Sequence, residues 1–163
     1  MVSEQSPSQR KKLSFADRLS MECINLNLKC STKDDAIRKL AQSIKSNEKI
    51  IDFDRFVSDV FKREKEASTG IGNGVAIPHA RTNAVNDFIV AIGRNLPGIA
   101  FDAVDGKDVE IIILMGTPLQ KIQQYLKLLA HLTNLLKRPG FISGLKNAKT
   151  PQELIALFRS FEK

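Results

Sequence analysis

Strand-like and helix-like apolar patterns alternate along this chain of 163 residues, and that alternation limits its fold more than any other feature. Residues 24–28 alternate apolar and polar side chains, which predicts a half-buried strand. Residues 88–92 predict a second strand, and the almost wholly apolar residues 109–115 predict a fully buried one. Helical patterns separate and follow these strands, so the chain is expected to form one compact α/β domain.

Periodic apolar residues and capping residues predict where the helices lie. A first helix is expected from the N-cap Ser31 to about residue 46, and a second begins after the cap Asp52. A long helix is expected over residues 119–137. Thr150 opens a capping box, which predicts one more helix at the C-terminal end of the sequence.

The second of these helices places a carboxylate on its apolar face. Glu64 lies eleven residues after Phe53, which at about 100° per residue returns it to the middle of that face, with Arg63 at the edge. An inward carboxylate at a helix C-terminus is disfavoured by desolvation and by the helix dipole. Either the helix frays before Glu64, or Arg63 and Glu64 form a partly buried arrangement that supports a site.

Charge and cysteine content narrow the class of function. The net charge is +7, but lysines and arginines are scattered without interleaved aromatic residues, so nucleic-acid binding is not expected. Cys23 and Cys30 lack CxxC spacing and have no histidine nearby in sequence, so we expect two reduced thiols and no metal site.

The sequence also bears on location and on domain bounds. No apolar run approaches the roughly 20 residues of a membrane span, and the N-terminus lacks the apolar region of a secretory signal. We therefore expect a cytoplasmic protein that does not insert into a membrane. Residues 1–12 are polar and basic and are expected to form a disordered tail, which leaves residues 13–163 as the folded domain.

A glycine-rich segment followed by a histidine is the strongest chemical signal. Three glycines lie within residues 70–74, and Pro78 and His79 follow a short apolar stretch. The segment lacks the Gly-Lys-Ser/Thr of a P-loop and the third glycine of a dinucleotide fingerprint. It predicts a permissive loop whose N–H groups approach a small anion, beside a proline-stiffened His79 whose neutral imidazole can attack a phosphoryl group. The alternative is a surface or core histidine without that role.

Residues 63–65 and 68–79 together resemble the enzyme IIA (EIIA) domains of the bacterial phosphotransferase system, in its fructose, mannitol and nitrogen-regulatory branch. The resemblance extends more loosely from about residue 17 to the C-terminus. It implies an α/β fold in which a mixed five-stranded β-sheet is flanked by helices on both sides. It also implies that His79 accepts a phosphoryl group on Nε2 from the small phosphocarrier HPr or a paralogue, without a cofactor.

The resemblance assigns further site residues. Arg63 matches the family arginine that steadies the phosphoryl charge, and Glu64 occupies a matching position beside it. Thr69 and Gly70 match positions that support the phosphoryl site. The sugar-transporting branch has a second histidine on the long helix where this chain has Tyr125, which can donate a hydrogen bond to a phosphoryl oxygen but cannot replace a charge.

One other departure adjoins His79, and the sequence has one further histidine. Ala80 follows His79 where many family members have glycine, and His131 lies at the polar border of the long helix, where we interpret it as a surface or boundary residue. Three functions stay open. The first is a stand-alone nitrogen-type regulator that binds different target proteins in its two phosphorylation states. The second is the IIA component of a fructose/mannitol-type uptake system with a IIB acceptor. The third is an interaction module that is not phosphorylated.

Overall fold

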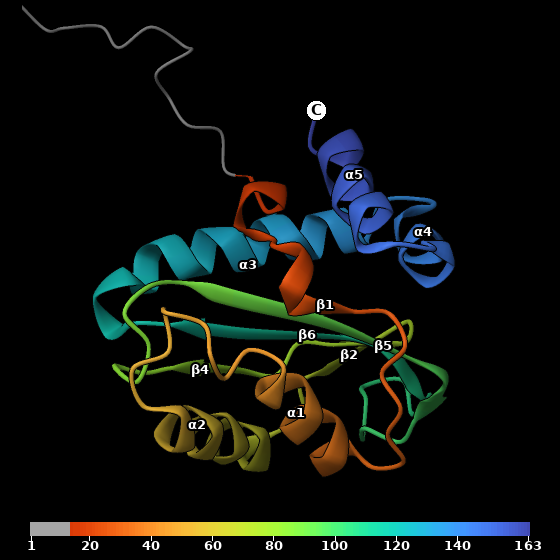
Figure 1. The fold of residues 1–163 in the computed structure, drawn as a ribbon. Coiled ribbons are helices and arrows are strands. Elements are labelled where there is room, and N and C mark those ends of the chain that lie inside the picture. Colours follow the sequence, from red (N-terminus) through yellow and green to blue (C-terminus); the bar gives the residue numbers. More distant parts are fainter. Residues whose placement is uncertain (1–13) are drawn as a thin grey trace, which may run out of the picture.

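The structure, a computed structural model, describes residues 14–163, and the expected tail over residues 1–12 lies outside them. One mixed sheet has helices on both faces (Figure 1). Its order is β1-β5-β6-β3-β2, with β4 also paired to β6, and the β5–β6 pair is antiparallel while β3 and β4 run parallel to β6. The strands are β1 (Ile24–Asn25), β2 (Gly70–Gly72), β3 (Val75–Ala76), β4 (His79–Arg81), β5 (Ile89–Ile99) and β6 (Val109–Thr117).

The sheet in the described part of the chain has six strands, whereas the family resemblance implied five. β3 and β4 form one line beside β6 in a single register, since Ala76 lies opposite Ile112 and His79 lies opposite Met115. Pro78 interrupts that line because proline has no N–H to donate, although its carbonyl accepts a hydrogen bond from the Met115 N–H at 2.9 Å. The five lateral positions are therefore present, and the sixth strand results from one position being divided.

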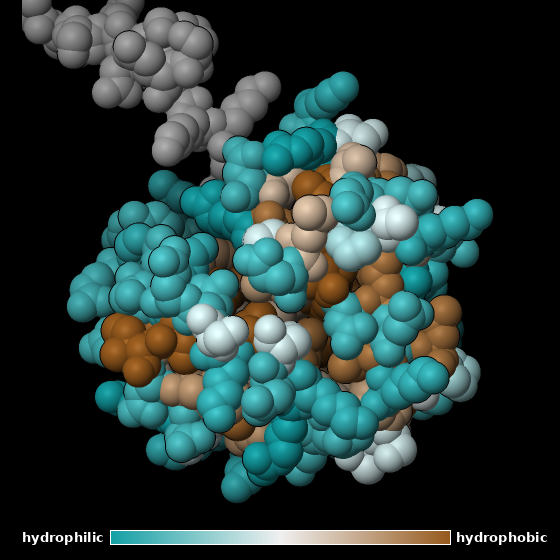
Figure 2. Space-filling model, viewed as in Figure 1, coloured by the Kyte–Doolittle hydropathy of each residue, from teal (hydrophilic) through white to brown (hydrophobic). Residues whose placement is uncertain are grey.

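Within residues 14–163 five α-helices cover the sheet, with α1 and α2 on one face and α3, α4 and α5 on the other (Figure 1). The central strand β6 supplies both cores, since Ile113 packs on the α3 side and Ile112 on the α1 and α2 side. Polar side chains cover most of the face in Figure 2, with apolar side chains between them in separate patches. The helices are α1 (Lys33–Gln42), α2 (Phe53–Glu66), α3 (Ile122–Leu136), α4 (Phe141–Asn147) and α5 (Pro151–Phe161).

The helix starts agree with the capping residues in two of three cases. Asp52 accepts a hydrogen bond from the Arg55 N–H, and Thr150 caps α5, as expected. The prediction of Ser31 as the first cap is wrong, because the Thr32 hydroxyl accepts the Asp35 N–H at 3.1 Å and α1 begins one residue later. The strand expected over residues 24–28 and the first helix are both shorter than predicted, and α4 was not predicted.

His131 lies at the boundary between α3 and the C-terminal helix, in agreement with its interpretation as a boundary residue. Its side chain is 25% exposed, and its Nε2 lies 2.5 Å from Oε2 of Glu162. The Glu162 carboxylate also accepts hydrogen bonds from the N–H groups of Phe15 and Ala16, at 2.6 and 2.9 Å. His131 therefore takes part in a contact that joins the two ends of the described chain to α3.

Candidate functional site

His79 is the first residue of β4 and lies half-buried at a groove between β4 and α2. The groove has a volume of about 330 Å³. Basic side chains outnumber acidic ones along it, which favours an anionic ligand. The charged lining residues are Arg55, Asp59, Lys62, Arg63, Glu66 and Arg81.

The imidazole of His79 is oriented by its own backbone. Nδ1 lies 2.9 Å from the carbonyl oxygen of Ile77, and because a carbonyl can only accept a hydrogen bond, Nδ1 is the nitrogen that carries the proton. In the neutral ring Nε2 then keeps its lone pair. Pro78 lies between the two residues and fixes its own φ, which limits the freedom of this short loop.

The surroundings of His79 favour the neutral ring. Burial is the largest influence and lowers the pKa of His79, the hydrogen bond with the Ile77 carbonyl acts in the opposite direction, and the cations of Arg63 and Arg81 lower the pKa further. The carboxylate of Glu64 raises it. The net shift is downward from the ordinary value of 6.5, so the imidazole is a neutral nucleophile at neutral pH.

α2 continues through Glu66, so the helix does not fray before Glu64. Glu64 is buried and Arg63 is half-buried beside it, which fits the partly buried arrangement expected from the helical pattern, although the two side chains have different partners. The Arg63 guanidinium donates to the carbonyl of Ala67 at 2.9 Å and thus lies at the C-terminal end of its own helix, where a cation is favoured.

Glu64 points inward as its helical angle predicted, and its partner is a residue that sequence reasoning missed. The side chain of Glu64 is 4% exposed, and Oε1 lies 2.8 Å from Nζ of Lys33, the first residue of α1. The same oxygen accepts the N–H of Thr69 at 3.0 Å. No local pattern links Lys33 to Glu64, because α1 and α2 are separated by a loop and their contact depends on how both pack on the sheet.

Two N–H groups of the glycine-rich segment, those of Gly70 and Asn73, have partners within the protein. Asn73 lies at φ 58° between two glycines of positive φ, and its N–H donates to Oδ2 of Asp105 at 3.0 Å. The N–H of Gly70 donates to the hydroxyl of Ser68 at 3.1 Å. A Cβ on Gly70 would lie 2.8 Å from Cα of Ala103, so glycine is needed there for packing. Support of the phosphoryl group by Gly70 stays a prediction.

Tyr125 faces His79 from α3. The two ring centroids are 5.8 Å apart, and the tyrosine is 3% exposed. Burial raises the pKa of Tyr125 to about 12, so the hydroxyl keeps its proton and can donate. Within residues 14–163 this hydroxyl has no hydrogen-bond partner, and neither do Oε2 of Glu64 and Oγ1 of Thr69. Three buried polar atoms near the histidine thus keep unused hydrogen-bonding capacity.

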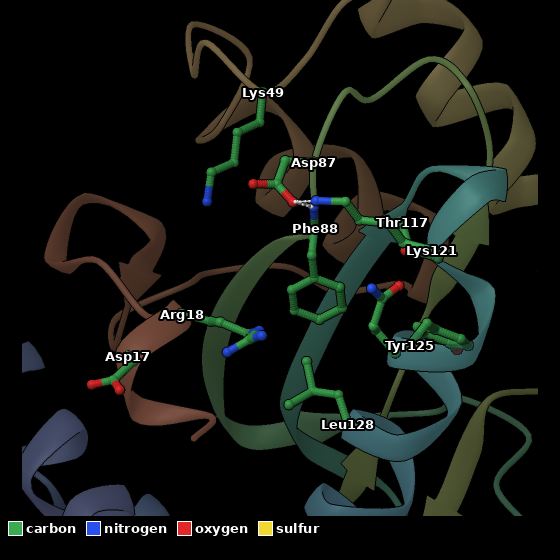
Figure 3. A pocket seen from close by; sticks show the side chains of 10 residues that line it. Asp17, Arg18, Lys49, Asp87, Phe88, Thr117, Lys121, Tyr125 and Leu128 are labelled. Atoms are coloured by element: carbon green, nitrogen blue, oxygen red, sulfur yellow. Dashed lines mark hydrogen bonds and ion pairs between the residues drawn. The ribbon is translucent and has the colours of Figure 1, made fainter. Parts of the chain in front are cut away.

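A second pocket, of about 340 Å³, lies outside the groove and has Tyr125 in its wall (Figure 3). Figure 3 shows Phe88 and Leu128 beside Tyr125. In the same pocket Nζ of Lys121 lies 2.7 Å from Oδ1 of Asp87 and forms an ion pair with it. Tyr125 therefore contacts His79 and also contributes to a cavity outside the groove.

Cys23 and Cys30 are both free thiols. Within residues 14–163 no group of three or more His, Cys, Asp and Glu side chains is placed to hold a metal ion. The same part of the chain contains no helix that is both long and apolar enough to cross a membrane.

Comparison with known proteins matches this chain to a family. The family model for the phosphoenolpyruvate-dependent sugar phosphotransferase system, EIIA 2, matches residues 18–161. The fructose-like EIIA component of Escherichia coli is 32% identical over 139 residues, which cover 85% of this chain and 94% of that protein. The fructose-specific EIIABC component of Bacillus subtilis is 26% identical over 93% of this chain, which spans only 24% of that longer protein.

Solved structures agree with the family match. The nitrogen regulatory protein IIA-Ntr from Neisseria meningitidis superposes with a TM-score of 0.82 at 26% identity, over 88% of this chain and 97% of that one. The mannitol enzyme IIA from Escherichia coli, solved in complex with phosphorylated enzyme IIB, gives a TM-score of 0.75 over 87% of this chain and 97% of that one. Its identity is 21%, so this second likeness shows the fold.

The hydrogen bond at Nδ1 predicts the state of His79 in solution. With ¹⁵N-labelled protein, imidazole NMR at neutral pH should show Nδ1 protonated and Nε2 unprotonated, and the titration midpoint should lie below 6.5. A neutral ring protonated on Nε2, or a His79 midpoint above 6.5, would contradict the site as described.

Proposed function

Because the chain belongs to the EIIA 2 family of the phosphoenolpyruvate-dependent sugar phosphotransferase system, we propose that it carries a phosphoryl group on His79 between two protein partners. The observation that supports this most directly is the contact of Nδ1 with the Ile77 carbonyl, which leaves Nε2 as the free nucleophile. Nε2 donates its lone pair to phosphorus while the N–P bond of the donor phosphohistidine breaks, and the donor nitrogen keeps that electron pair.

The charges around His79 suit both the imidazole ring and the phosphoryl group that it accepts. Attack by Nε2 leaves positive charge on the ring, and the Ile77 carbonyl accepts a hydrogen bond from the Nδ1 N–H where that charge develops. The phosphoryl oxygens meet the basic groove, where Arg63 and Arg81 are the cations that act most directly on the imidazole. The buried Tyr125 hydroxyl, which keeps its proton, is a further donor for a phosphoryl oxygen.

The partners follow from the family. The donor is HPr or a paralogue, and the acceptor is either a IIB protein or a regulated target. The mannitol enzyme IIA was solved with phosphorylated IIB, which supports IIB as a partner class. Tyr125 in place of a second histidine favours the nitrogen-type regulatory role, as does the likeness to IIA-Ntr. The 32% identity to a fructose-like EIIA component supports sugar uptake as the second candidate. A cytoplasmic location stays part of the proposal.

Phosphorylation should occur on one histidine only. After incubation with phosphoenolpyruvate, enzyme I and HPr, intact mass should show a single added phosphoryl group, labile in acid and stable in base as a phosphoramidate. His79→Ala should abolish the addition. His131→Gln is the matched control, since it keeps a polar group toward Glu162, and it should be modified like the wild type. A phosphoryl group that is still added to His79→Ala, or that resists acid, would contradict phosphorylation of His79.

Arg63 should contribute to the rate. Arg63→Ala should slow phosphoryl uptake by at least about tenfold, which corresponds to ~1.4 kcal/mol of transition-state stabilisation. The same change should raise the pKa of His79, because the Arg63 cation lowers it. The fold should persist, since the hydrogen bond from the Arg63 guanidinium to the Ala67 carbonyl is exposed at a helix end. Lys65→Ala, which changes an exposed residue on the same helix turn, is the control. Equal rates of phosphoryl uptake in the two variants would show that Arg63 does not contribute to the transfer.

A further inference from the structure

We propose that Lys33 is a positioning residue for His79, acting through the buried carboxylate of Glu64 and the backbone of Thr69 and Ile77. The inference rests on the proposed role of His79 as phosphoryl acceptor. It adds a residue from α1, an element that contributes no side chain to the groove itself.

A continuous series of hydrogen bonds joins Lys33 to the imidazole. Nζ of Lys33 lies 2.8 Å from Oε1 of Glu64, which also accepts the Thr69 N–H at 3.0 Å. The Thr69 carbonyl accepts the Ile77 N–H at 3.0 Å. The Ile77 carbonyl then holds Nδ1 of His79 at 2.9 Å. Each contact fixes the residue that makes the next one, so a shift of the Glu64 carboxylate moves the carbonyl that orients the imidazole.

Lys33 and Glu64 each occupy a position that is unfavourable without the other. Lys33 is the first residue of α1, where the helix dipole disfavours a cation, and its side chain is only 19% exposed. Its Nζ also lies 4.9 Å from the ring centroid of the buried Phe101. Glu64 is 4% exposed, and a buried carboxylate without a cation is strongly destabilising. The pair therefore places a carboxylate together with a cation beside Thr69, at the start of the glycine-rich segment.

The charge of Lys33 also bears on the titration of His79. The titratable and charged groups around the imidazole are Arg63 and Glu64 from α2, Arg81 from β4 and Tyr125 from α3. Among them Glu64 is the one whose charge favours a protonated ring, and the Lys33 cation at 2.8 Å offsets that charge. Loss of Lys33 leaves the field of Glu64 uncompensated, so the pKa of His79 rises and less neutral imidazole is available.

The test compares Lys33→Met with Lys39→Met, which removes the same charge from a more exposed position on the same helix. Two quantities are measured: the pKa of His79 by imidazole NMR, and the rate of phosphoryl uptake from phosphorylated HPr between pH 5 and 8. Lys33→Met should raise the pKa of His79 and shift the acid limb of the pH–rate profile to higher pH. It should also slow phosphoryl uptake at neutral pH about tenfold. Lys39→Met should change neither, and Lys33→Arg should recover most of the rate.

Folded Lys33→Met protein with the wild-type pKa and rate profile would show that Lys33 is only structural. If Lys33→Met does not fold, Glu64→Gln is compared with the double variant Lys33→Met/Glu64→Gln, which buries no unpaired charge. The double variant should have the higher His79 pKa of the two, and equal values would overturn the proposal. The titration needs no donor, so a wild-type protein that takes up no phosphoryl group refutes the proposed function and leaves this test intact.

Discussion

The hydrogen bond between Nδ1 of His79 and the Ile77 carbonyl is the interaction on which the chemistry of this site depends. It assigns the ring proton to one nitrogen and leaves the other with a free lone pair. The backbone that supplies the carbonyl is held on two sides, because the Ile77 N–H bonds to Thr69 and the Pro78 carbonyl accepts from Met115 in the central strand. The break between β3 and β4 at Pro78 is therefore the feature that presents the histidine.

The site combines residues from distant parts of the chain, and each lies on a regular element. α2 contributes Arg63 and the buried Glu64, α3 contributes Tyr125, and α1 contributes Lys33 through Glu64. Helices on opposite faces of one sheet thus converge on β4, as Figure 1 allows the reader to follow. A phosphoryl group at His79 would add negative charge at this junction, where a partner protein can distinguish the two states.

Local patterns in the sequence predicted the local features of this structure and failed where packing decides. The inward angle of Glu64 and the caps Asp52 and Thr150 follow from spacing along one helix, and all three are confirmed. The pairing of Glu64 with Lys33, and the use of the Asn73 N–H by Asp105, join segments far apart in sequence. Such contacts depend on the relative placement of whole elements, which periodicity within one segment does not contain. The family resemblance predicted a role for His79 and named neither Lys33 nor Asp105 as a partner residue.

The central claim is that Nε2 of His79 is the nucleophile because Nδ1 is held by the Ile77 carbonyl. The most direct test is ³¹P and ¹⁵N NMR of protein phosphorylated with labelled histidine, in which one-bond coupling identifies the nitrogen bonded to phosphorus. The account predicts coupling to Nε2 of His79 while Nδ1 keeps its proton. Coupling to Nδ1, or phosphorus on any other side chain, would contradict it.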